Sequence, residues 1–194
     1  MDELAGAHGM RCADVLPLSW QGGSLPGAAE AARLDDDNVH TLKAVAALEE
    51  YATEPADESD PESLEQRRLN DKVNILLEMV GHLLALHASA PAPVAVTLSS
   101  DAVEWDAFAG AAPADGARGI VRLYLHRYVP RPLCLAGVAR CEDRGDGRVR
   151  VRLEFAPLGA PLASALERHV FRRHRRAIAG ARRPGGPAAS PGPP

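Results

Sequence analysis

The period of the hydrophobic residues changes at Pro91 and Pro93, and this change constrains the fold more than any other feature of the sequence. Before the two prolines, apolar residues recur every three or four positions, which is the spacing of an α-helix. After them, apolar and polar residues alternate, which is the spacing of a half-buried β-strand. We therefore expect a helical segment followed by a β-rich segment within the 194 residues of the chain.

The strongest helical pattern lies between Pro61 and His87. Its apolar residues occupy the a and d positions of a coiled-coil heptad: Leu69, Val73, Leu76, Val80 and Leu83. A helix of about 27 residues is roughly 40 Å long, so its outer turns extend past a small domain and need a partner. Two interpretations are open, namely burial against the first helix and the barrel, or self-association. We favour self-association, because the first helix offers only a thin apolar stripe, and expect the five residues to form an oligomer interface.

A shorter helix is expected before it, from Asp35 to about Tyr51. Its apolar positions recur at helical spacing: Leu42, Val45 and Leu48. Residues 35–38 read Asp-Asp-Asp-Asn, which offers N-cap side chains and favourable negative charge for a first helical turn. The two helices together predict a helical insertion over about residues 35–88.

The β-rich part is expected to include residues 14–20, where Val15 to Trp20 reads VLPLSW, and residues 92–157. Alternating apolar residues mark the later strands: Val94, Val96 and Leu98; Val121, Leu123 and Leu125; Leu133 and Leu135; Val149, Val151, Leu153 and Phe155. Turns are indicated at residues 114–116 and 144–147, whose Gly and Asp residues tolerate positive φ. Short strands at this spacing favour an antiparallel sheet or barrel, so the predicted fold class is α+β.

A last helix is expected over about residues 161–180, opened by Pro161 and ended by Gly180. Its predicted buried face is apolar: Leu162, Leu166, Val170 and Ala177. Its predicted exposed face is basic: Arg168, Arg172, Arg175 and Arg176. Arg173 and His174 flank the apolar stripe. Residues 1–10 are expected to be flexible, and residues 184–194, rich in Pro, Gly and Ala, to be disordered.

The composition argues against several classes of protein. Cys12, Cys134 and Cys141 lack metal-ligand spacing and are odd in number, which fits a reducing, cytoplasmic location without a disulfide framework. No signal-peptide pattern is visible, and no apolar run approaches the roughly 20 residues of a membrane span. The motifs of a nucleophile elbow, a phosphate-binding loop and a zinc protease are missing from the sequence. We therefore expect a protein without enzymatic activity, metal or cofactor.

The net charge of −4 hides a basic cluster on the last helix and an acidic stretch over residues 35–65. The planar guanidinium of arginine matches pairs of phosphate oxygens and stacks on purines, so the cluster indicates a nucleotide or phosphate site. The alternative interpretation is charge that complements the C-terminal end of the helix dipole. Specific binding to nucleic acids is not expected, because the chain is negative overall and no exposed aromatic residue is expected among the arginines.

Four segments in this order resemble the atypical PilZ family, the cyclic di-GMP receptor-like PilZ proteins of xanthomonad-type bacteria. They are VLPLSW, the helix LNDKVNILLEMVGHLLAL from Leu69 to Leu86, the strand pair VTLSSDAVEW and the closing helix HVFRRHRRAIA. The resemblance implies a single domain over residues 11–183, with a six-stranded PilZ β-barrel, a C-terminal helix and a helical pair inserted after the first strand. It also implies that the inserted pair serves oligomerisation in some members, and that the protein acts in cyclic di-GMP signalling with outputs such as motility, biofilm or virulence.

The chain departs from the PilZ pattern at both ligand motifs. Only Arg11 precedes the first expected strand, where the family carries RxxxR, and in place of [DN]xSxxG the chain keeps Ser99 but has Thr97 and Ala102. These departures direct attention to a different mode of contact. The candidates for cyclic di-GMP contact are Arg172, Arg173, Arg175, Arg176 and, as a lesser one, Ser99. The alternative function is a PilZ-like adaptor that does not bind the dinucleotide and contacts an unidentified regulatory protein through its helical insertion.

Overall fold

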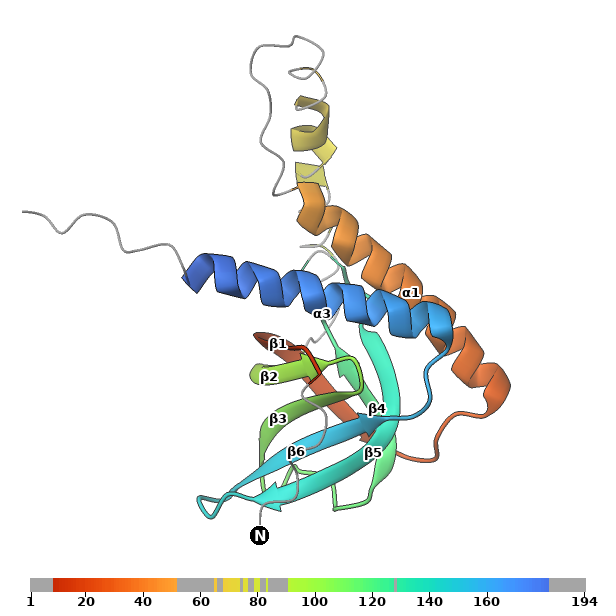
Figure 1. Cartoon of the computed structure of the whole chain (residues 1–194), viewed down its shortest axis with the longest axis vertical. Helices are drawn as coiled ribbons and strands as arrows, with labels where there is room; N and C mark the ends of the chain where they lie inside the picture. Colours follow the sequence, from red (N-terminus) through yellow and green to blue (C-terminus); the bar gives the residue numbers. More distant parts are fainter. Residues whose placement is uncertain are drawn as a thin grey trace, which may run out of the picture.

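A computed structural model describes residues 9–51, 65, 68–73, 75–76, 79–80, 83, 91–127 and 129–181. Six antiparallel strands close into a barrel in the order β1-β2-β3-β6-β5-β4 (Figure 1). The strands are β1 (Arg11–Gly22), β2 (Pro93–Ser99), β3 (Ala102–Phe108), β4 (Arg118–Leu123), β5 (Leu133–Asp143) and β6 (Arg148–Phe155). Two helices pack on the barrel, α1 (Ala28–Tyr51) and α3 (Ala160–Ala181). The α+β class and the six-stranded barrel with inserted and C-terminal helices are therefore confirmed.

The barrel interior is filled by the apolar residues that alternate along each strand. Those with no exposed surface are Val103, Val121, Leu123, Leu133, Ala139, Val151 and Leu153. Closure leaves the barrel without an edge strand, because each of the six strands pairs with another strand on both sides along part of its length. The predicted turn at 144–147 is also present: Gly145 and Gly147 have φ of 78° and 75°, and Gly116 has 76° in the other predicted turn.

α3 covers one end of the barrel. It packs on β1, on β2 and on α1, while α1 also contacts β5 (Figure 1). Leu162, Leu166 and Val170 of α3 are buried, as the helical spacing predicted. Ala177 is exposed, contrary to the prediction, because the end of α3 extends past the barrel. Neither helix, nor any described part of the insertion, is long and apolar enough to cross a membrane.

α1 begins at Ala28 rather than at Asp35, so the prediction of an N-cap at residues 35–38 was wrong. The alanine-rich stretch before Asp35 forms the first turns, in keeping with the high helix propensity of alanine. The polar residues instead lie mid-helix and attach α1 to the rest of the domain. Asp35 accepts a hydrogen bond from the backbone N–H of Gly159 at 2.6 Å, just before α3.

Asn38 makes the tightest of these attachments. Its side-chain amide donates to the carbonyl of Cys134 at 2.7 Å, and its oxygen accepts from the Cys134 N–H at 2.8 Å. Cys134 lies on β5 before Gly137, where pairing with β6 begins. The asparagine therefore supplies the two hydrogen bonds that a neighbouring strand would supply, and it is only 2 % exposed.

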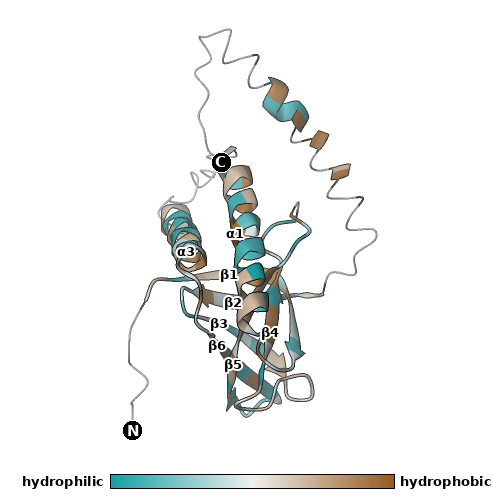
Figure 2. Ribbon diagram, turned by 90° about the vertical axis from the view of Figure 1, so that its right-hand side faces the viewer, coloured by the Kyte–Doolittle hydropathy of each residue, from teal (hydrophilic) through white to brown (hydrophobic). Residues whose placement is uncertain are grey.

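The five residues predicted for an oligomer interface are helical and exposed. Their exposed fractions run from 44 % for Val73 to 60 % for Leu76. The described part of this helix, yellow in Figure 1, lies past the end of α1 and away from the barrel, and Figure 2 shows the same separation with apolar residues on the helix. Burial of these side chains against the first helix and the barrel is therefore wrong. The remainder of the predicted helix over 61–87, the N-terminal residues 1–8 and the tail at 184–194 lie outside the described residues.

Candidate functional site

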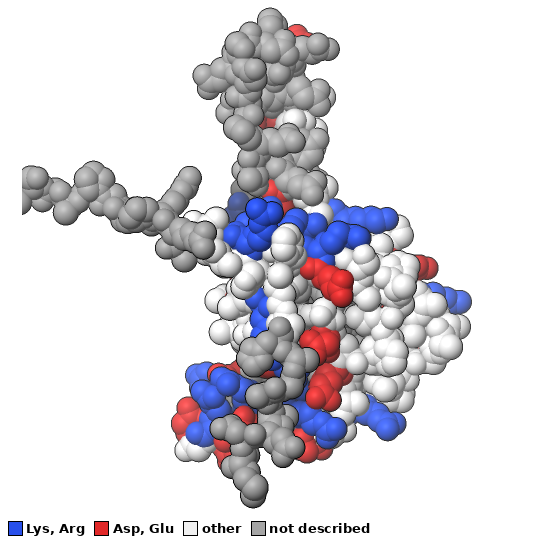
Figure 3. Space-filling view, viewed as in Figure 1, with Lys and Arg blue, Asp and Glu red and all other residues white. Residues whose placement is uncertain are grey.

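The arginines of α3 are the largest concentration of positive charge on the face shown in Figure 3, where Lys and Arg gather along the helix above patches of acidic residues. They divide into two groups by their contacts. Arg173 and Arg176 form ion pairs with carboxylates of α1 and the barrel, whereas Arg168, Arg172 and Arg175 have no carboxylate partner among the described residues. The two groups have different chemical roles, because only in the second is the guanidinium charge not neutralised by a described carboxylate.

The inner group holds a buried carboxylate. Glu49 of α1 is 7 % exposed, and its two oxygens lie 3.2 Å from Nε of Arg173 and 2.9 Å from Nη1 of Arg176. Arg173 also lies 3.2 Å from the carboxylate of Asp14 on β1 and donates to the carbonyl of Leu125. Removing a carboxylate from water is favourable only with such compensation. Arg176 was predicted on the exposed stripe; its side chain is 40 % exposed, and it also pairs with Glu49.

The edge position predicted for Arg173 and His174 is confirmed. His174 Nδ1 lies 2.9 Å from the backbone carbonyl of Arg11 on β1, so both residues attach α3 to the barrel. Next to them, His169 is 1 % exposed, and its Nδ1 has no hydrogen-bond partner among the described residues. Burial, assisted by Arg173, Arg172 and Arg176, lowers the pKa of His169 from 6.5 to about 4. The imidazole is therefore neutral at pH 7 and adds no charge to the cluster.

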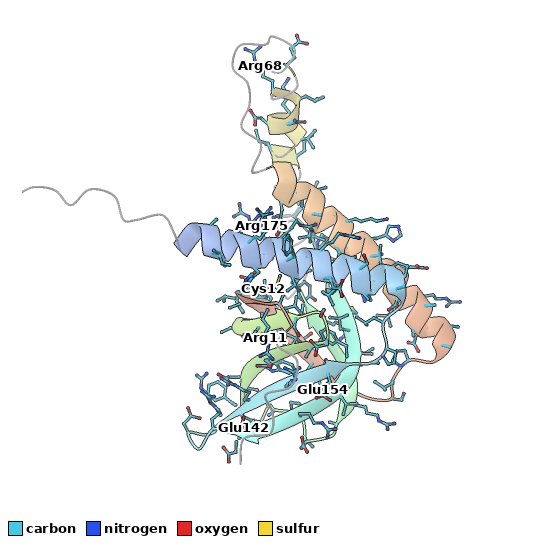
Figure 4. All side chains as sticks on the ribbon, in the orientation of Figure 1. Arg11, Cys12, Arg68, Glu142, Glu154 and Arg175 are labelled. Carbon is cyan, nitrogen blue, oxygen red and sulfur yellow. The ribbon has the colours of Figure 1, made fainter. Side chains whose placement is uncertain are left out.

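The outer group has no carboxylate partner in the described part of the chain. Arg168 donates to Ser164 at 2.8 Å, and the guanidinium of Arg175 lies over the ring of Phe171, 5.6 Å from its centre. The Nε of Arg172 is buried without a hydrogen bond to any described residue. Figure 4 shows Arg175 on the side of α3 that points away from the barrel. Guanidinium groups that are not neutralised by carboxylates are well suited to bind phosphate.

An exposed aromatic residue stands among these arginines, contrary to the prediction. Phe171 is 45 % exposed and lines a cleft of about 460 Å³ between α3, the start of β1 and the turn from β2 to β3. The cleft is lined by Gly9, Met10, Ser100, Glu167, Arg168, Val170 and Phe171. It combines an apolar floor with charged side chains at the rim, which is the usual composition of a small-molecule site.

Ser99 lies close to this cleft but is engaged in the fold. Its Oγ accepts a hydrogen bond from the backbone N–H of Ala102 at 3.0 Å and lies 2.7 Å from a carboxylate oxygen of Asp101. The side chain is buried and closes the turn between β2 and β3. Its neighbour Ser100, which sequence reasoning passed over, is the serine that lines the cleft.

Sequence reasoning also missed a second group of arginines, on the outer face of the barrel. Each lies near a carboxylate: Arg11 and Arg152 near Glu104, Arg152 also near Asp101, Arg150 near Asp106, and Arg140 near Glu154. Arg11 is the first residue of β1 and does not lie before the strand as expected. The outward alternation of β6 was visible in the sequence, but the pairing of Arg152 with Glu104 depends on the register of β3 and β6. This face is locally neutralised, so it competes poorly with α3 for anions.

The cysteines and the acidic residues suggest no chemistry in the described part of the chain. Burial raises the pKa of the Cys12 thiol to about 11 and also raises the pKa of Cys134 and Cys141. Thiols with raised pKa values are poor nucleophiles. Among the residues that the structure describes, no group of three or more His, Cys, Asp or Glu could hold a metal ion.

Comparisons with known proteins agree with this architecture. Residues 42–183 match the family model described as the atypical PilZ domain, cyclic di-GMP receptor. A crystal structure of a protein from Xanthomonas campestris, described as a tetrameric PilZ domain self-assembled via an unusual helical bundle, is similar with a TM-score of 0.69 and 26 % identity. That similarity covers 89 % of this chain and 92 % of the other. No curated protein matches the chain. The matched region includes the last part of α1, the strands β2 to β6 and α3, and the chain therefore belongs to the atypical PilZ family, a cyclic di-GMP receptor family.

Proposed function

We propose that this protein is a cyclic di-GMP effector that binds the dinucleotide on the outer face of α3 and works as an oligomer assembled through its helical insertion. It has no catalytic step; ligand binding changes the surface offered to a regulatory protein. The observation that carries the proposal is the group of three α3 arginines without carboxylate partners in the described chain, beside a cleft of suitable size.

The phosphates of the ligand are assigned to Arg172 and Arg175. The two residues are three positions apart on α3, so their side chains lie on neighbouring turns of one face. Each guanidinium can donate two hydrogen bonds to one phosphate group, and a cyclic dinucleotide carries two phosphates. Arg175 already lies over Phe171, and this cation–π contact holds the guanidinium in place. Because the contact uses none of its N–H groups, they can still donate to a phosphate.

The other sequence candidates have a supporting role in this proposal. Arg173 and Arg176 hold Glu49 and become available to a phosphate only if that contact opens. Ser99 fixes the turn that places Ser100 at the cleft. Such a site does not need the N-terminal RxxxR motif, because its positive charge comes from the opposite end of the chain.

Calorimetric titration with cyclic di-GMP tests the receptor role. We expect saturable binding to the wild-type protein, weakened at least about tenfold, or about 1.4 kcal/mol, by Arg172→Ala with Arg175→Ala. Arg131→Ala is the matched control, since Arg131 is an exposed arginine outside α3 that pairs with Asp37 of α1. A wild-type protein that gives no heat at high micromolar ligand would overturn the receptor role.

The oligomeric part of the proposal rests on the exposed apolar residues of the insertion. Side chains such as Leu76 and Val80 are more than half exposed at heptad positions, where burial in a helical bundle is favourable. The similar Xanthomonas campestris protein is described as self-assembled via a helical bundle. If the ligand does not bind, this helix supports the second candidate function, an adaptor that acts through protein–protein contacts alone.

Light scattering tests the assembly. Leu76→Glu with Val80→Glu places two charges in the predicted seam and should reduce the measured mass to that of a monomer. Phe108→Glu is the control, because Phe108 is 68 % exposed but lies at the end of β3, outside the insertion. The same monomeric mass for wild type and double variant would contradict self-association.

A further inference from the structure

We propose that the cleft beside α3 is a pocket for one guanine base, in which Glu167 selects guanine over adenine. The inference rests on the proposed cyclic di-GMP function and goes beyond it by assigning the base. Its starting point is the juxtaposition of an exposed aromatic ring, an acid and an arginine on consecutive turns of one helix: Phe171, Glu167 and Arg168.

The walls of the cleft suit a flat aromatic ligand. Phe171 is 45 % exposed on α3, and Met10, just before β1, is 42 % exposed. The cleft therefore has two partly exposed large apolar side chains in its lining. A purine stacked on the phenylalanine ring, with the flexible thioether on its other side, would remove both from water. At about 460 Å³ the cleft falls in the range of small-ligand pockets, roughly 300–1,000 Å³.

The charged rim distinguishes between the purines. Glu167 lies one helical turn before Phe171, so its carboxylate projects over the same side of α3 as the ring. The Watson–Crick edge of guanine presents two N–H donors, N1–H and the N2 amino group, and a carboxylate accepts both. The same edge of adenine presents one donor and the N1 lone pair, which a carboxylate repels. An acid at this position therefore favours guanine.

Arg168 strengthens the same preference. Its guanidinium can donate to both O6 and N7 of guanine, the most frequent specific contact between arginine and a base, whereas adenine has a donor amino group in place of O6. Among the described residues, Arg168 donates a single hydrogen bond, to Ser164. Arg172 and Arg175 continue along the same helix, so a base in the cleft would leave its phosphates next to them.

The test is a binding measurement with two cyclic dinucleotides on four purified proteins. Wild type, Glu167→Gln, Phe171→Leu and the control Glu142→Gln are titrated with cyclic di-GMP and with cyclic di-AMP. Glu142 is an exposed acid at the far end of the barrel from α3 (Figure 4). Glutamine has the size of glutamate but replaces one acceptor oxygen by a donor. GMP is added as a competitor, to show whether a single guanine nucleotide occupies the site.

Glu167→Gln should weaken cyclic di-GMP at least about tenfold while cyclic di-AMP binds no more weakly than before, because a bidentate base contact gives roughly this discrimination. Phe171→Leu should weaken both ligands alike, since stacking does not distinguish bases. Glu142→Gln should leave both affinities unchanged. Wild-type binding of cyclic di-GMP with unchanged selectivity in Glu167→Gln would overturn the base assignment and leave the receptor role intact. Failure of the wild type to bind would overturn the receptor role itself, and the base assignment with it.

Discussion

Replacement of Asn38 by alanine should destabilise the domain by far more than an ordinary helix substitution. The variant leaves the N–H and the carbonyl of Cys134 without their partners, in a place where the side chain is 2 % exposed. Each unsatisfied buried group costs about 1–3 kcal/mol. The better helix propensity of alanine offsets about 0.6 kcal/mol. We therefore expect a net loss of about 1.5–5 kcal/mol in the free energy of unfolding.

Urea unfolding followed by circular dichroism, at one fixed protein concentration, measures the loss. Asp37→Asn is the matched control, because it removes the ion pair between Asp37 and Arg131, whose partners are 62 % and 59 % exposed respectively. Loss of such an exposed pair should change the free energy of unfolding by about 0.5 kcal/mol or less. Asn38→Asp keeps the acceptor for the Cys134 N–H but presents a second acceptor to its carbonyl, so it should be about as harmful as Asn38→Ala. Equal stabilities for Asn38→Ala and Asp37→Asn would refute the reasoning.

Three further predictions concern titratable groups. His169 takes up a proton near pH 6.5 when unfolded and near pH 4 when folded. The contribution of its neutral form to the free energy of unfolding is therefore fully present above pH 6.5 and is lost as the pH falls toward 4. Between pH 7 and pH 5 the loss from this residue is about 2 kcal/mol, and in urea unfolding His169→Leu should show a correspondingly smaller drop than wild type. Glu49→Gln removes the counter-charge of two partly exposed arginines, Arg173 and Arg176. It should lower the free energy of unfolding by about 2 kcal/mol. An unchanged midpoint of urea unfolding would contradict the buried ion pair. Cys12 should react last with a thiol reagent in the native protein, because its thiol is buried and its pKa is about 11; labelling that reaches Cys12 before Cys134 and Cys141 would argue against this packing.

The fold was predictable where one local pattern decides the structure. Alternation and Gly-Asp turns identified the later strands, and helical spacing identified the docking residues of α3 such as Leu162 and Leu166. The start of α1 was not predictable in this way, because Asp and Asn side chains at positions 35 and 38 can either cap a helix or attach its middle to a barrel. Only the positions of Gly159 and Cys134, far away in the sequence, decide between these roles.

The candidate site divides in the same way. That α3 is basic could be predicted from its composition, but which arginines are available could not. Arg172 and Arg176 have similar places on a helical wheel, yet only Arg176 meets Glu49, because the crossing of α1 and α3 brings that acid to it. The cleft was missed for a similar reason: Met10, Ser100 and Phe171 come from three distant segments that meet only after the barrel closes.

The contact of Glu49 with Arg173 and Arg176 places two ion pairs of α3 at the end of α1. Glu49 lies two residues before the end of α1, where the chain continues toward the insertion. Under the proposed function, an anion that drew either arginine away from Glu49 would leave a buried carboxylate without its counter-charge. The end of α1 would then be less firmly held against α3. Ligand binding on α3 and the position of the inserted residues would thereby be coupled across the width of a single helix.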